Sequence, residues 1–132
     1  MTRDEVGPST EPAESIDAGT LAALEDQLGH DVLNQMIERY LDEAEAAIRR
    51  MEQAVDDDHV VDLTCAAHRL KGGSMTLGFV GLGALCASLE DGADASTVTE
   101  RQQAVQSLRE ARADLRLWQR RRLPITDSSS VN

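Results

Sequence analysis

The chain has 132 residues, of which 41% are hydrophobic, 28% charged and only 2% aromatic, so its length and composition fit one globular domain with an aliphatic core. The formal net charge is −11, and residues 1–62 carry 17 acidic against 4 basic side chains, which argues against nucleic acid as a partner. The sequence has no run of eighteen apolar residues and no signal-peptide pattern, so we expect a cytoplasmic protein without a membrane partner.

Both ends of the chain lack the periodicity of folded segments. Residues 1–15 mix proline, serine, threonine, glycine and acids, and residues 124–132 begin with a proline that would stop a helix. We therefore expect disordered tails at 1–15 and 124–132 and one folded domain at 16–123. Because no alternating pattern typical of strands occurs between the tails, the predicted fold class is all-α.

Three helices are predicted in the first part of this domain. A short helix at 20–28 begins with Thr20 as its N-cap and ends at Gly29. A long helix at 31–55 shows sustained 3.6-residue spacing of apolar side chains. The aspartates at 56–58 then form a turn and supply the N-cap of a third helix, which runs to about Leu77 and is closed by Gly78.

Two further helices complete the pattern. The apolar side of a short fourth helix carries Leu82, Leu85, Cys86 and Leu89. The apolar side of a fifth helix at 96–123 carries Val98, Val105, Leu108, Ala111, Leu115 and Trp118. Because the connections are short, we expect the last four helices to form an antiparallel four-helix bundle, with the helix at 20–28 as a short additional N-terminal lid.

The third helix carries one histidine outside its apolar stripe. That stripe consists of Leu63, Ala66, Ala67, Leu70, Ser74 and Leu77. At 100° per residue, His68 lies about 150° from the centre of the stripe, so it is predicted to face out of the bundle. It shares the outward face with Thr64, Cys65, Lys71, Gly72 and Met75. This face is small and weakly polar, which favours contact with another molecule.

Lys71 is the single lysine of a chain with twelve arginines, and it follows His68 by three positions, within reach on one helix face. An ammonium group is a compact charge that can follow a phosphoryl group, whereas a guanidinium suits fixed bidentate pairing. Gly72 and Gly73 each cost about 1 kcal/mol relative to alanine in a helix interior. A glycine beside His68 would let another molecule approach the backbone closely.

The segment from Ala67 to Glu90, AHRLKGGSMTLGFVGLGALCASLE, resembles the histidine-containing phosphotransfer (HPt) domain. The resemblance covers about residues 16–123, and Gly73 departs from it, because the family more often has Ser or Ala there. The matching elements are Ala67-His68, Leu70-Lys71-Gly72, Ser74, Gly78, Leu82, Leu85-Cys86 and Leu89-Glu90.

The resemblance implies a phosphorelay intermediate of two-component signalling. His68 would accept a phosphoryl group from a receiver-domain aspartyl phosphate and pass it to an aspartate of another receiver. Lys71 would stabilise the phosphate, and Glu90 would accept a hydrogen bond from the Nδ1–H of His68. An exposed imidazole, whose pKa in water is about 6.5, is largely an uncharged nucleophile at neutral pH. The partner would contact the surface formed by Thr64, Cys65, Gly72 and Met75.

The implied partners are response-regulator receiver domains and, as a further candidate, a hybrid sensor histidine kinase. We expect a monomer that is a covalent intermediate without autonomous catalytic activity, because the sequence has no acid pair, Ser/His/Asp set or glycine-rich phosphate loop. No cofactor is expected on this chain. The Mg²⁺ for transfer would come with the acidic pocket of the receiver.

Two other functions fit parts of the sequence. A metal site could draw on Cys65 and His68, three positions apart on a helix, together with His30, His59 and Cys86. No two of these residues show finger or ribbon spacing, and both cysteines are expected to be thiols. The second alternative is a helical interaction protein that binds a receiver or kinase without transferring phosphate. Phosphate incorporation separates it from a phosphorelay intermediate.

Overall fold

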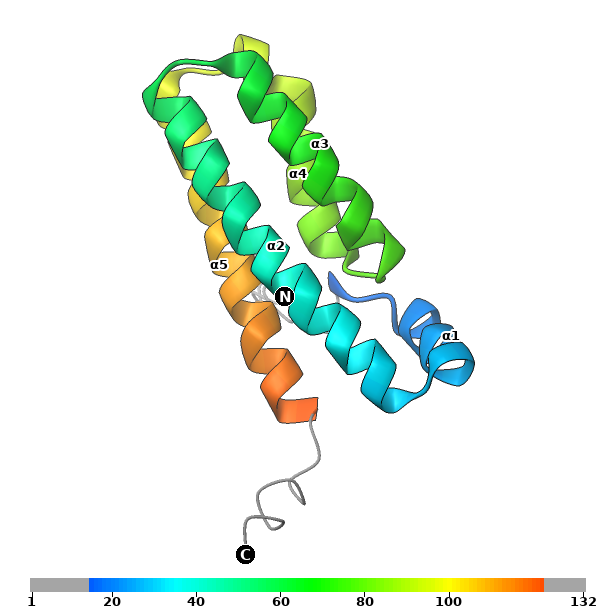
Figure 1. Ribbon diagram of the computed structural model, residues 1–132. Coiled ribbons are helices and arrows are strands. Elements are labelled where there is room, and N and C mark those ends of the chain that lie inside the picture. Colours follow the sequence, from blue (N-terminus) through cyan, green and yellow to red (C-terminus); the bar gives the residue numbers. More distant parts are fainter. Residues whose placement is uncertain (1–14, 123–132) are drawn as a thin grey trace, which may run out of the picture.

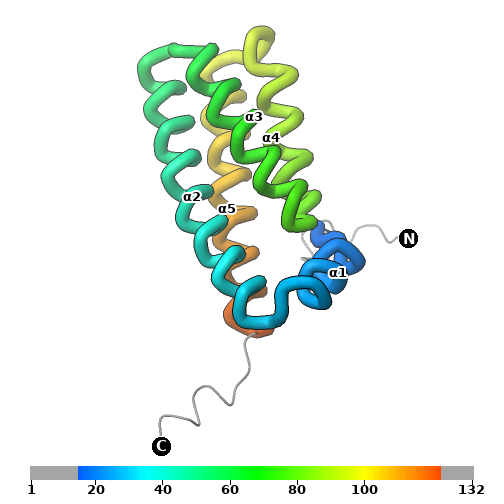
Figure 2. The backbone as a smooth tube through the Cα atoms, turned by 45° about the vertical axis from the view of Figure 1, so that its right-hand side comes forward, coloured from blue at the N-terminus to red at the C-terminus, as the bar shows by residue number. Residues whose placement is uncertain are grey.

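In the computed structural model, which describes residues 15–122, four helices run alternately up and down and form a bundle (Figure 1). They are α2 (His30–Asp56), α3 (Val60–Thr76), α4 (Val80–Gly92) and α5 (Val98–Arg122), and a 3₁₀ turn, η4 (Ala93–Ala95), joins the last two. Each helix packs against the next, and α5 closes the bundle by packing against both α4 and α2 (Figure 2). The predicted all-α, antiparallel four-helix bundle is confirmed.

The core consists almost entirely of aliphatic side chains from the inner faces of these helices. The three aromatic residues of the sequence meet at one end of it. Phe79, in the turn between α3 and α4, lies between Tyr40 of α2 and Trp118 of α5, with ring centroids 5.1 and 5.8 Å apart. Side chains that are completely or almost completely buried include Leu33, Ile37, Leu41, Ile48, Met51, Leu63, Phe79, Cys86 and Leu108. No described helix is both long and apolar enough to span a membrane.

The short helix α1 (Ala18–Leu28) covers the end of the bundle where α3 turns into α4 (Figure 1). The backbone amide of Asp17 donates to the carbonyl of Gly78 at 2.7 Å. Gly78 has a φ of +85°, and a Cβ there would lie 3.0 Å from Cβ of Thr20, so glycine is needed both for the turn and for the close approach of α1. The predicted lid and the predicted glycine ends at Gly29 and Gly78 are confirmed.

Two predicted N-caps are wrong. Asp17, not Thr20, caps α1, because its carboxylate accepts hydrogen bonds from the amides of Gly19 and Thr20 while the Thr20 hydroxyl donates to it. The N-cap of α3 is His59, which makes no side-chain capping bond. The preceding Asp58 has a φ of +58°, and its carboxylate accepts a hydrogen bond from the Arg101 guanidinium of α5, so it does not cap the start of α3.

Two residues assigned to apolar stripes lie at the surface. Leu85 of α4 is 36% exposed and Val98, the first residue of α5, is 48% exposed. Helix α5 begins at Val98, two residues later than predicted, because Thr97 and Glu100 exchange side-chain-to-amide hydrogen bonds of the capping-box type. The predicted tails at 1–15 and 124–132 lie outside the described residues, apart from Ser15, which packs against Gly81. Leu123, the predicted end of α5, also lies outside them.

Candidate functional site

Helix α3 presents His68 to solvent because the opposite side of the helix is held in the core. All six residues of the predicted apolar stripe are buried, which fixes the rotation of the helix. The buried Ser74 hydroxyl donates to the carbonyl of Leu70 and accepts from the Tyr40 hydroxyl, at 2.8 and 2.6 Å. Burial raises the pKa of Tyr40, so this phenol stays a hydrogen-bond donor. The helix remains continuous through Gly72 and Gly73.

The His68 side chain is 66% exposed, and one of its ring nitrogens is held by α4. His68 Nδ1 lies 2.8 Å from Oε2 of Glu90, 22 residues further along the chain. An ionised carboxylate only accepts hydrogen bonds, so Nδ1 carries the proton and the neutral ring leaves Nε2 as its basic nitrogen. The predicted contact between Glu90 and the Nδ1–H of His68 is therefore present.

Glu90 accepts a second hydrogen bond with its other oxygen. The Lys71 ammonium donates to Oε1 at 3.0 Å, so one carboxylate of α4 joins the histidine and the lysine of α3. The hydrogen bond from Lys71, and to a smaller degree that from His68, holds the pKa of Glu90 below its ordinary value. Glu90 is thus ionised at neutral pH. The sequence did not predict this pairing of Lys71.

The predicted partner surface lies along the same outward side of α3. Thr64, Cys65, His68 and Glu90 line a shallow hollow of about 520 Å³, together with Arg69. A Cβ placed on Gly72 would have no atom within 4 Å, so the backbone beside His68 is open. Met75 is 50% exposed, and its sulfur lies over Gly83 of α4, where a Cβ would come within 2.6 Å of it. Gly83 thus lets Met75 lie flat on the bundle.

Two residues near His68 were missed by the sequence analysis. Val61 is 73% exposed and lies on the same side of α3, seven residues before His68, so the apolar part of the outward face extends one turn further. The sequence analysis did not consider Arg69, which lines the hollow that contains His68. Helical spacing could have found Val61, whereas the hollow lined by Arg69 depends on how α4 packs beside α3.

The alternative metal site gains no support from the geometry. Among residues 15–122, no three side chains of His, Cys, Asp or Glu lie close enough together to bind a metal ion. His30 and His59 pair instead with Glu25 and Asp62 at their own helix starts. Cys86 is fully buried, and burial raises the pKa of its thiol to about 12, which disfavours the thiolate that a metal requires.

Comparison with solved structures supports the fold. The chain resembles the crystal structure of histidine-containing phosphotransfer protein B (HptB) from Pseudomonas aeruginosa PAO1, with 23% identity, a TM-score of 0.76 and coverage of 83% of this chain and 94% of that one. A provisionally assigned histidine-containing phosphotransfer protein from rice has 16% identity and a TM-score of 0.75, with coverage of 85% and 83%. No curated protein sequence matches the chain significantly.

The family assignment rests on the sequence itself. The sequence model of the Hpt domain matches residues 35–118, a segment that contains His68, Lys71 and Glu90 and spans α2 to α5 except for their outer ends. Members of this family are phosphotransfer intermediates that interact with receiver domains and kinases. The chain therefore belongs to the Hpt domain family and is a phosphorelay intermediate of two-component signalling.

Proposed function

We propose that His68 is the residue that carries the phosphoryl group, taking it from the aspartyl phosphate of one receiver domain and passing it to an aspartate of another. The observation that carries the proposal is the pairing of an exposed imidazole with Glu90 at 2.8 Å through Nδ1. Among the histidines, His30 is paired through both ring nitrogens, and His59 faces Asp62 beside the α2–α3 turn. Only His68 combines exposure with an adjacent lysine and an open glycine.

The transfer step needs no proton to leave the ring. The Nε2 lone pair of His68 attacks the phosphorus and forms an N–P bond. The P–O bond between the phosphorus and the aspartate side-chain oxygen of the receiver breaks, which returns that aspartate as a carboxylate. The ring then carries a positive charge, with its proton still on Nδ1. The adjacent Glu90 carboxylate favours that charge and keeps the ring oriented for the reverse step to the second receiver.

Lys71 is proposed to contact the phosphoryl oxygens. Its ammonium has three donors, and the hydrogen bond to Glu90 occupies one of them. The chain itself supplies the nucleophile, its orientation and one cation, and we assign the remaining chemistry to the receiver. Mg²⁺ in the receiver's acidic pocket would neutralise charge on the transferring group. The chain would accordingly be a covalent intermediate without autonomous catalysis.

The receiver is proposed to dock on Thr64, Cys65, Gly72 and Met75 around His68, with Val61 at the edge. The exposed side chains here are apolar or small, and the open backbone at Gly72 allows close approach. We further propose that the protein acts as a monomer in the cytoplasm, since a net charge of −11 disfavours self-association. Sedimentation velocity and cell fractionation would test these two points.

The direct test is incubation of the purified protein with ³²P-labelled receiver domains from the same cell. We expect acid-labile, base-stable label on this chain, and peptide mapping should place it on His68. Retained binding without any label would instead favour the helical interaction protein. Label on His30 or His59 would contradict the assignment of His68 while leaving the family function intact.

A further inference from the structure

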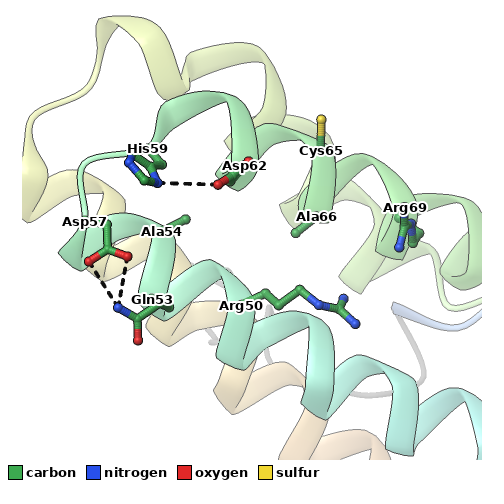
Figure 3. Close-up of a pocket in the computed structure, with 9 residues that line it drawn as sticks. All are labelled: Arg50, Gln53, Ala54, Asp57, His59, Asp62, Cys65, Ala66 and Arg69. Atoms are coloured by element: carbon green, nitrogen blue, oxygen red, sulfur yellow. Dashed lines mark hydrogen bonds and ion pairs between the residues drawn. The ribbon is translucent and has the colours of Figure 1, made fainter.

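A furrow between α2 and α3, on the side of α3 next to His68, contains two arginines without acidic partners. One cavity of about 310 Å³ lies toward the α2–α3 turn and a second of about 300 Å³ lies further along, beside Gly73. Arg50 of α2 and Arg69 of α3 line both cavities, so they lie where the two meet. In Figure 3, Arg50 extends from α2 toward the part of α3 that carries Arg69.

Of the eleven arginines in residues 15–122, six are neutralised by carboxylates, and the two arginines of the furrow are not among them. Six arginines form ion pairs with carboxylates, namely Arg49, Arg101, Arg109, Arg112, Arg116 and Arg122. Within residues 15–122, neither Arg50 nor Arg69 has a carboxylate within ion-pair distance, although Glu43 lines the same furrow. Both arginines therefore present a free positive charge.

The acidic groups of the first cavity are engaged elsewhere. Asp57 accepts two hydrogen bonds from the Gln53 amide, at 3.0 and 3.1 Å, and Asp62 pairs with His59 at 3.5 Å (Figure 3). These pairs lie at the turn end of the furrow, whereas the arginines lie where the two cavities meet, with Arg69 next to His68 in the sequence. The free positive charge of the furrow therefore lies at its middle, where Arg69 borders the hollow that contains His68.

Arg69 connects the furrow to that site. It is adjacent to His68 in the sequence, and it also lines the hollow formed by Thr64, Cys65, His68 and Glu90. A partner seated over His68 would thus cover Arg69 and come close to Arg50. Because the chain as a whole carries a net charge of −11, an acidic partner is repelled by its overall charge and attracted to these two arginines.

We propose that Arg50 and Arg69, the basic pair, bind carboxylate side chains of the receiver beside its acidic phosphorylation pocket and steer the receiver onto His68. This inference rests on the proposed function, because it names the residues that orient the same partner. A carboxylate entering the furrow would find one guanidinium on each wall, each able to give two parallel N–H bonds. The basic pair acts on encounter and orientation, while His68, Lys71 and Glu90 act on the phosphoryl group.

The test uses a double variant and a control of equal charge. Arg50→Ala/Arg69→Ala and Arg120→Ala/Arg121→Ala each remove two exposed, unpaired arginines and each change the net charge from −11 to −13. Arg120 and Arg121 lie near the end of α5 and line neither cavity. The probe is the phosphorylated receiver domain that labels the wild-type protein, and the readout is kcat/KM for transfer at low salt and at about 0.5 M NaCl.

At low salt we expect the furrow variant to lose about tenfold in kcat/KM, with little change in the rate at saturating receiver, and the control to lose less than about twofold. At high salt the three proteins should converge, because screening removes the attraction. Circular dichroism should show the same melting for all three, since the removed groups are exposed and unpaired.

Three results would overturn the proposal that the basic pair steers the receiver. Equal rates for the wild type and the furrow variant would show that the arginines do not steer, and an equal loss in the control would assign the effect to net charge. A faster loss of phosphohistidine in the furrow variant, with an unchanged salt dependence, would place Arg69 on the phosphoryl group. Labelling by phosphoramidate, a small phosphoryl donor, distinguishes a failure of steering from a failure of the proposed function. A wild-type protein labelled by neither phosphoramidate nor the receiver refutes the proposed function and this inference with it.

Discussion

The outward face of α3 and the seam between α2 and α5 are both exposed to solvent, yet they are built from different residues. The seam is crossed by ion pairs: Arg109 donates to Glu52 and Glu45 at 2.8 to 3.3 Å, and Arg116 donates to Glu38 at 2.9 and 3.0 Å. The face around His68 has one such link, the carboxylate of Glu90. Apart from Arg69 at its edge, its other side chains are small or apolar.

The difference in residue types between the two surfaces corresponds to two roles, namely holding helices together and binding a partner. Cross-helix ion pairs satisfy long side chains within the molecule and hold α5 to α2, but they leave little that a partner could bind without breaking them. A face of small residues contributes less to the fold and can be desolvated at low cost when a partner covers it. We therefore expect substitutions on α3 to change transfer, and substitutions in the seam to change stability.

The largest expected effect is that of His68→Gln, set against Arg109→Ala. His68→Gln should abolish acid-labile label and leave the thermal midpoint unchanged, since an exposed side chain contributes little to the core. Arg109→Ala should transfer normally but lower the free energy of unfolding by about 1 kcal/mol, because two carboxylates lose their bidentate partner. Persistent label in the His68 variant, measured by acid-lability assay, would remove the central proposal.

Next in size are the groups bound to Glu90. Lys71→Ala should slow transfer about a hundredfold, because the phosphoryl oxygens lose their neighbouring cation, and Lys71→Arg should restore part of it. Glu90→Ala should also slow transfer, through a less ordered imidazole, while Glu90→Gln, which can still accept from Nδ1–H, should lose less. Single-turnover rates give the comparison. Equal rates for Lys, Arg and Ala at position 71 would mean that the lysine serves only to bind Glu90.

The adjacent glycines give a smaller and opposite pair of effects. Gly72→Gln fills open space beside His68, so it should stabilise the helix by about 1 kcal/mol and yet slow transfer about tenfold. Gly73→Ala places its methyl group about 3.7 Å from the Tyr40 ring, an ordinary contact, and should stabilise the fold without affecting transfer. Urea titration and transfer kinetics test both variants. A Gly72→Gln protein that transfers as fast as its parent contradicts the close approach of the receiver.

The smallest effect is the acid dependence of the α3–α4 link. The folded-state pKa of Glu90 is depressed by Lys71, so its contribution to stability is present above the unfolded-state pKa and is lost as pH falls through the lower folded value. Glu90→Gln cannot titrate. The difference in urea midpoint between wild type and Glu90→Gln should therefore be constant near neutral pH and shrink below about pH 4. A difference that persists into stronger acid would show that Glu90 is not the titrating link.

Much of this molecule could be predicted from its sequence because helical periodicity is a local property. The apolar spacing placed the helices, and the six-residue stripe of α3 fixed the direction of His68. Errors occurred where several nearby residues compete for one role. Asp17 and Thr20 can both cap a helix start, and the choice depends on which oxygen reaches the free amides.

The contacts that could not be predicted from the sequence depend on how the helices pack against one another. The hydrogen bond from Lys71 to Glu90 joins two helices, and its presence follows from the distance between them and not from any spacing along one helix. The same holds for Arg50 and Arg69, which lie on facing walls of one furrow although 19 positions separate them in the sequence. The contact between His68 and Glu90 was expected only because the segment resembles a known family.

Glu90 and His68 lie on different helices, which makes competence for signalling a property of the assembled tertiary structure. In a nascent or partly unfolded chain, α3 without a docked α4 would present a freely rotating imidazole whose proton can occupy either nitrogen. Such a chain has the nucleophile but not its orientation. The rate of transfer should then follow the population of fully folded molecules. Partly unfolded molecules would transfer the phosphoryl group poorly and would contribute little to signalling.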